Sequence, residues 1–315
     1  MSHPVLSVIG ARVATGSRPG ERTDGHRVAL VVEGGGMRGI VSAAMTAAIE
    51  DLGLLDAFDL AVGTSAGALN AAALLAGVAG GCTDEYAEGF TTRGFINPAR
   101  VLLGRPVVNV EYVIDFNSHR LDAGRHARTA ASPIPLHCIA TDVDTCAAAD
   151  LTGLTELADL RAALLATSRL PWIGGDPVRY RGRRWLDGGL SEPVPVRTAL
   201  AAGATHLLVL MTRSHGAVMT NGGGLGDRLL QRRLHALNPD LVGLYRRRSA
   251  GYAAITEEVL AATNAPGSAP PYLMGIALPA GSPVPSRLDR DPARLHAAAT
   301  LAHRVARETL TMCRG

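Results

Sequence analysis

The sequence predicts an α/β protein, a three-layer α/β/α domain with a mostly parallel central sheet. Short, nearly uninterrupted apolar runs rich in β-branched residues, such as residues 27–32, are typical of strands buried on both faces of a parallel sheet. Between them lie alanine- and leucine-rich segments with helical spacing, such as residues 40–52. The 315-residue chain is 47% hydrophobic but only 4% aromatic, which agrees with aliphatic helices packed on such a sheet.

Residues 1–25 lack the charged start and long apolar centre of a secretory signal, so we expect a disordered leader there. Residues 26–315 are expected to form a single domain, because no internal repeat or linker divides them. Strands are expected at residues 27–32, 58–62, 135–141, 207–211 and 272–277, with a hairpin over 178–186 that turns at Arg181-Gly182. Helices are expected at residues 40–52, 66–79, 193–202, 241–260 and 292–312, with two more from residue 157 to before Pro171 and from residue 229 to near Pro239.

Three consecutive glycines, Gly34, Gly35 and Gly36, follow the first predicted strand and precede a helix. Glycine permits positive φ angles and lets the backbone approach a bound group closely. The amide groups at the start of a helix have no intrahelical partner and can stabilise a developing negative charge. This loop is therefore a candidate oxyanion-binding element.

A second loop has the spacing G-x-S-x-G, with Ser65 between Gly63 and Gly67. It lies between a predicted strand and an alanine-rich helix. In such a turn the glycines allow the strand and helix to approach closely, while the serine hydroxyl points outward. Ser65 is the first candidate nucleophile of a serine hydrolase.

A serine needs a base within hydrogen-bond reach to become a good nucleophile. The predicted hairpin ends at Asp187, which is followed by Gly188 and Gly189 and could meet Ser65 in space although the two are far apart in sequence. His215, in a loop after a predicted strand, is an alternative base that would complete a triad. His206, which begins that strand, is a weaker candidate because it is expected to be buried.

The order and spacing of these three motifs, within residues 27–210, resemble the patatin-like phospholipase family. The segment 166–168 with Pro171 nearby and the strand 137–142 also look like family landmarks. The first 25 residues and the last hundred contain no comparable motif. We expect the last hundred to complete the sheet and cover one of its faces.

The resemblance implies a lipid acyl-ester hydrolase of the phospholipase A or lysophospholipase type that works through an acyl-enzyme. It implies a Ser-Asp dyad, with Ser65 as nucleophile and Asp187 as base, and it requires no histidine, cofactor or metal. The implied oxyanion hole comprises Gly34, Gly35, Gly36 and Arg38, and the supporting motif glycines are Gly63, Gly67, Gly188 and Gly189.

Two alternatives remain open. Gly34, Gly36 and Gly39 also fit the dinucleotide-binding pattern G-x-G-x-x-G, with Asp56 or Asp59 near the position of a ribose-binding acid. A lone match of this kind is weak, and it leaves the serine loop without a role. The other alternative is a non-catalytic lipid-binding protein.

Composition excludes several classes of function. All 31 basic residues are arginine, which rules out a P-loop lysine, a Schiff-base lysine and a Ser-Lys dyad. A net charge of +3 without a basic stripe interleaved with aromatic residues argues against nucleic-acid binding. The four cysteines show no C-x-x-C spacing, which suggests neither a zinc site nor a disulfide framework and favours the cytoplasm.

Three segments are candidates for substrate or membrane contact. Residues 95–115, interrupted by Pro98 and Pro106, are expected to cover the active site. The glycine-rich residues 214–226 have the composition of a flexible lid. Arg246, Arg247 and Arg248 are candidates for peripheral contact with anionic lipid headgroups, or else form a solvated helix face.

Overall fold

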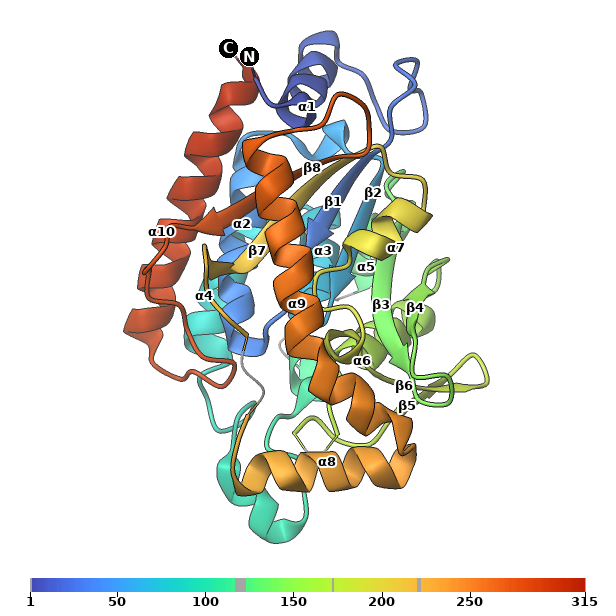
Figure 1. Ribbon diagram of the computed structural model, residues 1–315, viewed down its shortest axis with the longest axis vertical. Helices are drawn as coiled ribbons and strands as arrows, with labels where there is room; N and C mark the ends of the chain where they lie inside the picture. Colours follow the sequence, from blue (N-terminus) through green and yellow to red (C-terminus); the bar gives the residue numbers. More distant parts are fainter. Residues whose placement is uncertain (1, 117–122, 172, 220–221, 315) are drawn as a thin grey trace.

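The computed structural model describes residues 2–116, 123–171, 173–219 and 222–314 (Figure 1). At its centre is an eight-stranded sheet with the order β5-β6-β3-β2-β1-β7-β8, in which β4 also pairs with β3. The strands are β1 (Val28–Val32), β2 (Leu60–Thr64), β3 (Leu136–Asp142), β4 (Ala148–Leu151), β5 (Val178–Tyr180), β6 (Arg183–Asp187), β7 (His206–Ser214) and β8 (Tyr272–Leu278). The pairs among β1, β2, β3, β7 and β8 are parallel, so the predicted fold class is confirmed.

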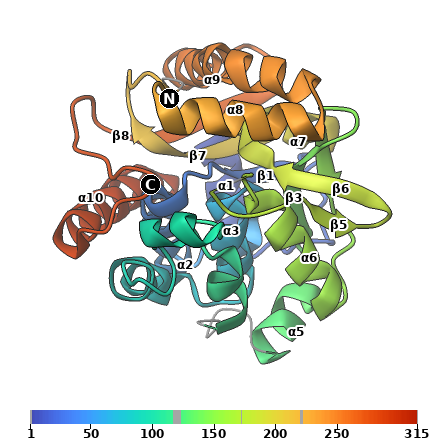
Figure 2. The same ribbon diagram turned by 90° about the horizontal axis from the view of Figure 1, so that it is seen from below.

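Helices cover both faces of the sheet (Figures 1 and 2). One face packs against α2 (Ile40–Asp51), α3 (Ala66–Leu75), α6 (Leu157–Ser168) and α10 (Pro292–Thr311), and the other against α7 (Val196–Ala201) and α9 (Asp240–Asn264). The remaining α-helices are α1 (Pro4–Thr15), α4 (Cys82–Asp84), α5 (Ala123–Ala131) and α8 (Leu225–Leu237). Both β4 and α5 are short elements that the hydrophobic pattern did not predict.

The first strand shows why its sequence is apolar throughout. Val28, Leu30 and Val32 belong to the core beneath α2 and α10. Ala29 and Val31 belong to the opposite core beneath α7 and α9. Because successive side chains of a strand alternate between faces, a strand with helices on both sides cannot alternate apolar and polar residues.

One edge of β3 is shared by two strands that run toward each other. Residues 136–139 pair with β2 in parallel, and residues 140–142 pair with β6 in antiparallel orientation. The strand β4 pairs with residues 138–141 and thus occupies the other edge. Thr64, the last residue of β2, is opposite Ile139, and Asp187, the last residue of β6, is opposite Ala140. The two strand ends therefore meet at adjacent positions of β3.

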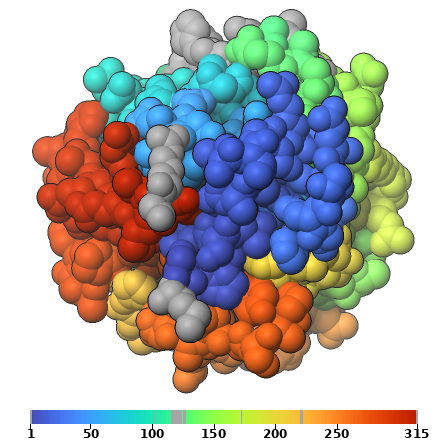
Figure 3. Space-filling view, turned by 90° about the horizontal axis from the view of Figure 1, so that it is seen from above, coloured from blue at the N-terminus to red at the C-terminus, as the bar shows by residue number. Residues whose placement is uncertain are grey.

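The structure differs from the expected disordered leader, because residues 4–15 form helix α1. His3 caps this helix by accepting a hydrogen bond from the amide of Val5 at 3.2 Å, and Pro4 occupies its first turn. The side chains of Val5, Leu6 and Ile9 are buried. Figure 3 shows the N-terminal residues, in blue, on the surface of the upper end of the molecule.

Arg12 fixes this helix to the domain. Its guanidinium donates to the carboxylate of Asp24 at 2.7 Å and to that of Asp59 at 2.8 Å, and only 2% of its side chain is exposed. It also donates to the carbonyl oxygens of Ala57 at 2.7 Å and His26 at 2.9 Å. A buried cation is tolerated when its donors are satisfied in this way.

Replacing Arg12 with leucine is therefore expected to lower the free energy of unfolding by about 3 kcal/mol, because it leaves a partly buried carboxylate without its cation. Urea denaturation followed by circular dichroism measures this loss. Arg18→Leu, at an exposed position just after the same helix, is the matched control and should change stability by less than about 0.5 kcal/mol. Equal effects of the two substitutions would contradict the prediction.

Candidate active site

Ser65 lies on the tight turn between β2 and α3. Its φ angle is 55°, in the left-handed region that serine seldom adopts. A Cβ atom at Gly63 would lie 2.5 Å from the Cα atom of Ala68. A Cβ atom at Gly67 would lie 2.2 Å from the carbonyl oxygen of Val32. Both glycines are thus required by close packing, and the turn directs the hydroxyl of Ser65 toward a cavity.

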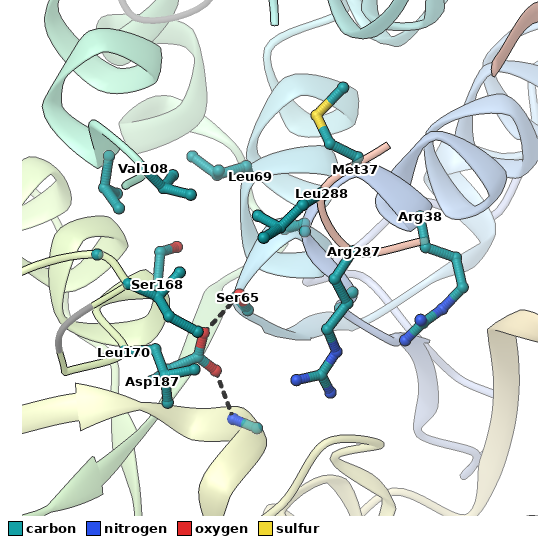
Figure 4. Close-up of a pocket in the computed structure, with 18 of the residues that line it drawn as sticks. Met37, Arg38, Ser65, Leu69, Val108, Ser168, Leu170, Asp187, Arg287 and Leu288 are labelled. Atoms are coloured by element: carbon teal, nitrogen blue, oxygen red, sulfur yellow. Dashed lines mark hydrogen bonds between the residues drawn. The ribbon is translucent and has the colours of Figure 1, made fainter. Parts of the chain in front are cut away.

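Asp187 lies beside this serine. Its Oδ2 atom accepts a hydrogen bond from the Oγ atom of Ser65 at 2.9 Å, and its Oδ1 atom accepts one from the amide of Gly189 at 2.7 Å (Figure 4). Burial raises the pKa of the Asp187 carboxyl above its usual range, an effect that the hydrogen bond from Gly189 and the charge of Arg287 partly offset. A raised pKa makes this carboxylate a stronger base than an exposed aspartate.

The contact depends on the meeting of β2 and β6 along β3. Gly188 lies in the corner between the strands, where a Cβ atom would be 2.1 Å from the carbonyl oxygen of Ile139 and 3.0 Å from the Cγ2 atom of Thr64. Only glycine fits there without displacing a strand. The hydroxyl of Thr141 donates to the carbonyl oxygen of Asp187 at 2.8 Å and so fixes the end of β6.

Thr167 supports the serine turn from α6. Its hydroxyl oxygen accepts a hydrogen bond from the amide of Ser65 at 2.8 Å and donates to the carbonyl oxygen of Ile139. In the sequence, residues 166–168 are a landmark of the family resemblance with no assigned role. In the structure, Thr167 connects the turn to β3.

The triple glycine follows β1 and packs directly on the serine turn. A Cβ atom at Gly34 would lie 2.2 Å from the carbonyl oxygen of Thr64 and 2.9 Å from the Cβ atom of Ser65. Among the described residues, no hydrogen bond uses the amide groups of Gly35 or Gly36. These amides adjoin the cavity at the start of the short 3-10 helix η1 (Gly36–Gly39).

Arg38 has a different position from the three glycines. It is buried, and its Nε atom donates to the hydroxyl of Thr212 at 3.2 Å, behind the loop and against β7. Burial lowers the pKa of this guanidinium to about 10, while the charge of Glu33 acts in the opposite direction. The hydroxyl of Thr212 in turn donates to the carbonyl oxygen of Gly34 at 3.2 Å. This geometry favours a supporting role for the Arg38 side chain.

The cavity beside Ser65 has a volume of about 260 Å³ and is mostly apolar. Five of the side chains that line it come from residues 95–115, the segment expected to cover the site. These are Phe95, Ile96, Val108, Val110 and Val113. Met219, from the expected lid over residues 214–226, also lines the cavity, whereas residues 220 and 221 of that segment lie outside the described residues.

Neither histidine proposed for a triad lines the cavity beside Ser65, and no other histidine is among the described residues that do. His206 begins β7 opposite Val28, at the other end of the sheet, and burial lowers its pKa to about 4. The amide of His215 donates to the carbonyl oxygen of Leu278. Ser65 therefore contacts Asp187 with no histidine from the described residues in the cavity wall.

The acid of the dinucleotide alternative lies at the wrong end of the sheet. Asp59 precedes β2 and accepts hydrogen bonds from Arg12 and Arg22, each at 2.8 Å. Because β1 and β2 are parallel, the amino end of β2 lies beside the amino end of β1. The glycine loop follows the carboxyl end of β1, at the other end of the sheet. A ribose-binding acid is expected at the carboxyl end of such a strand.

The three consecutive arginines of α9 point in different directions. Arg246 and Arg247 are exposed. Arg248 instead lines the cavity, with its guanidinium 4.0 Å from the ring centre of Tyr245. Burial lowers the pKa of Arg248 to about 10. The expected cluster therefore divides into a surface pair and one residue of the site.

Within the described ranges, no group of three His, Cys, Asp or Glu side chains is arranged to bind a metal ion. In the same ranges, none of the helices combines the length and apolarity needed to cross a bilayer.

A model of the patatin-like phospholipase family matches residues 30–200 of the chain, more than half of its 315 residues. The matched region contains the glycine loop, the serine turn and Asp187. The chain therefore belongs to the patatin-like phospholipase family.

Two individual proteins are also similar. The chain is 30% identical over 196 residues to the uncharacterized protein YjjU of Escherichia coli (strain K12). This alignment covers 59% of this chain and 52% of that protein. The chain thus spans about half the length of this curated relative. The crystal structure of VipD from Legionella pneumophila aligns with a TM-score of 0.47 at 12% identity, covering 91% of this chain and 67% of that one.

Arg287 is a charged residue of the cavity wall that the sequence did not indicate. It lies between β8 and α10 in a segment rich in proline and glycine without hydrophobic periodicity. No spacing relates this segment to the three motifs. Only the tertiary structure brings it to the glycine loop.

The raised pKa of Asp187 predicts that wild type and a variant with no ionisable group at this position differ in stability. A carboxyl whose pKa is raised by folding stabilises the protein at low pH, and this contribution is lost as the pH rises through the folded-state pKa. Asp187→Asn replaces an ionisable buried group by a neutral one of the same shape, so we expect its free energy of unfolding relative to wild type to increase as the pH rises through the folded-state pKa of Asp187. The difference should shrink as the pH falls to the usual range of carboxyl pKa values, about 4.

Urea denaturation of both proteins across this pH range measures the effect. Asp144→Asn, at an exposed carboxylate paired with Arg184, is the control and should show no comparable gain. A stability difference between the position-187 mutant and wild type that does not increase with pH would refute the prediction.

Proposed function

We propose that this protein hydrolyses carboxylic esters of lipids through an acyl-enzyme, as a phospholipase A or lysophospholipase. The observation on which this rests is the 2.9 Å hydrogen bond from the hydroxyl of Ser65 to Asp187 at the wall of an apolar cavity. Membership of the patatin-like phospholipase family supports a lipid ester as the substrate.

In the first half of the reaction, Asp187 takes the hydroxyl proton of Ser65 while the Oγ atom attacks the ester carbonyl. The amides of Gly35 and Gly36 donate to the resulting oxyanion, and each such donor contributes about 3–4 kcal/mol in comparable sites. The C–O bond to the alcohol then breaks, and Asp187 returns the proton to the leaving oxygen. The acyl group remains on Ser65.

In the second half, a water molecule attacks the acyl group and Asp187 accepts its proton. Collapse of the second tetrahedral intermediate releases the fatty acid, and the proton returns to the Oγ atom of Ser65. The same two side chains serve both halves, so the cycle needs no cofactor. The raised pKa of Asp187 supports this role, because proton transfer is most effective when the pKa of the base approaches the working pH.

The apolar residues of the cavity are suited to an acyl chain. Phe90, Phe95 and Leu170 line the cavity, and Figure 4 shows Val108 and Leu69 above Ser65. A non-catalytic lipid-binding protein would have the same cavity, and covalent labelling of Ser65 by a fluorophosphonate distinguishes the two functions. Labelling that is absent from the wild-type protein would favour the binding protein.

We also propose that the end of the molecule around the cavity contacts anionic membranes. Leu103 of η5 (Pro98–Leu103) and Leu225 of α8 are each 74% exposed, and Figure 1 shows the chain near residue 100 and α8 at the same end of the molecule. Residues 93–106 contain three arginines and no acidic residue, and residues 225–248 contain six arginines and two aspartates. Exposed apolar side chains among arginines are favourable at an anionic lipid surface.

Replacement of Ser65 by alanine or Asp187 by asparagine is expected to reduce hydrolysis of p-nitrophenyl esters by at least about a thousandfold. Ser7→Ala, at an exposed position of α1, is the control and should retain activity. The wild-type rate should fall with decreasing pH as Asp187 becomes protonated, with its midpoint above the usual carboxyl pKa of about 3.9. Full activity of either dyad mutant would overturn the mechanism.

The membrane contact predicts that replacing both Arg246 and Arg247 by glutamine weakens binding to phosphatidylglycerol vesicles by about thirtyfold, since each arginine near the surface contributes about 1 kcal/mol. Vesicle sedimentation measures the binding. The matched control replaces the exposed Arg304 and Arg307 of α10 and should bind as wild type does. Equal losses for the two double mutants would argue against this orientation.

A further inference from the structure

Two arginines from distant parts of the chain meet in the cavity next to the dyad. Arg287 follows β8, and Arg248 lies on α9. Both line the cavity, as Asp187 does. The mechanism proposed above uses neither guanidinium.

The backbone of Arg287 is fixed against the glycine loop. Its carbonyl oxygen accepts a hydrogen bond from the amide of Met37 at 3.1 Å. A Cβ atom at Gly36 would lie 2.6 Å from this same oxygen, so glycine is needed for the contact. The Cα atom of Arg287 is therefore held beside the candidate oxyanion hole, and its side chain extends into the cavity (Figure 4).

The guanidinium of Arg287 makes no hydrogen bond or ion pair with another residue in the described parts of the chain. Arginine has five donors, and partly buried donors usually have partners. The strongest charge acting on Arg248 is that of Arg287, and this repulsion lowers the pKa of Arg248 further than burial alone. Two guanidiniums that repel each other in a partly desolvated site are stabilised by an anion between them.

The cavity thus has two chemically different sides. Figure 4 shows Val108 and Leu69 on one side of Ser65 and Arg287 on the other. An ester bound at Ser65 with its acyl chain among the apolar side chains would direct its alcohol portion toward the arginines. A phosphate group matches guanidinium donors in charge and in geometry.

We propose that Arg287 and Arg248 form a phosphate-binding subsite that selects acyl esters whose alcohol portion carries a phosphate. This inference rests on the proposed function. The two arginines bind the phosphate oxygens and orient the ester, while Ser65 and Asp187 perform the chemistry. Neutral acylglycerols lack the group that this subsite binds.

The test compares three substrates with the same octanoyl chain: octanoyl glycerophosphate, octanoyl glycerophosphocholine and monooctanoylglycerol. Arg287→Gln is expected to lower kcat/KM for the two phosphate-bearing esters at least tenfold, as loss of a hydrogen bond to a charged group does. The change for monooctanoylglycerol should remain below about threefold. Arg248→Gln should act in the same direction, and Arg287→Lys should restore part of the loss.

Arg290→Gln is the matched control, because Arg290 lies in the same segment but is exposed and donates to the carbonyl oxygen of Thr91. All rates are compared on the alkaline plateau of the pH profile, where a change in the pKa of Asp187 has no effect. Equal losses on charged and neutral esters, or no loss on either, would overturn the subsite.

Two further measurements separate the possible sources of phosphate and the two proposals. Inhibition of p-nitrophenyl ester hydrolysis by glycerol phosphate, present in wild type and lost in Arg287→Gln, would show that the subsite also accepts free phosphate esters. Charge selectivity without such inhibition would restrict it to phosphate attached to the substrate. If Ser65→Ala abolishes p-nitrophenyl ester hydrolysis but Arg287→Gln shows no charge selectivity, only the subsite fails; activity that survives Ser65→Ala instead rejects the proposed function.

Discussion

The pairing of two opposed strands with one edge of β3 is the constraint on which the rest of the site depends. β2 ends opposite Ile139 and β6 ends opposite Ala140, so Ser65, which follows β2, and Asp187, which ends β6, are brought together without any flexible connection. The side-chain period of a strand is two residues, and a shift of β6 by one position would direct the carboxylate of Asp187 to the other face of the sheet. The hydrogen bond between Ser65 and Asp187 is therefore a consequence of strand register, and Gly188 maintains that register by occupying a corner too small for any side chain.

Most of the fold and the centre of the site could be predicted from sequence because their signals are local. A buried parallel strand is apolar throughout, and the turn at Ser65 needs glycine on both sides for reasons that hold within a few residues. The hairpin before Asp187 is likewise defined by its own turn, where Arg181 and Gly182 both have positive φ angles. The order β5-β6-β3-β2 is not local, and the meeting of two strand ends along β3 could only be anticipated through the family resemblance.

The features that could not be predicted from sequence depend on contacts between distant segments of the chain. The spacing of Val5, Leu6 and Ile9 is consistent with a helix, but the burial of Arg12 depends on Asp59, which lies 47 residues away. Arg287 belongs to a segment without periodicity and reaches the glycine loop through a backbone hydrogen bond. The run Arg246 to Arg248 looked like one surface, although successive residues of a helix point about 100° apart and only the last faces the cavity.

The contact between the carbonyl oxygen of Arg287 and the amide of Met37 has a consequence for how recognition and chemistry are connected. One residue supplies both a side chain in the cavity and a backbone acceptor that holds the start of η1. A ligand that immobilises the side chain of Arg287 also restricts the peptide groups next to Gly36, and by thermodynamic reciprocity an ordered loop pre-organises that side chain. Binding of a ligand to the side chain of Arg287 and alignment of the amide donors next to Gly36 are thus linked through a single peptide unit rather than through a moving domain.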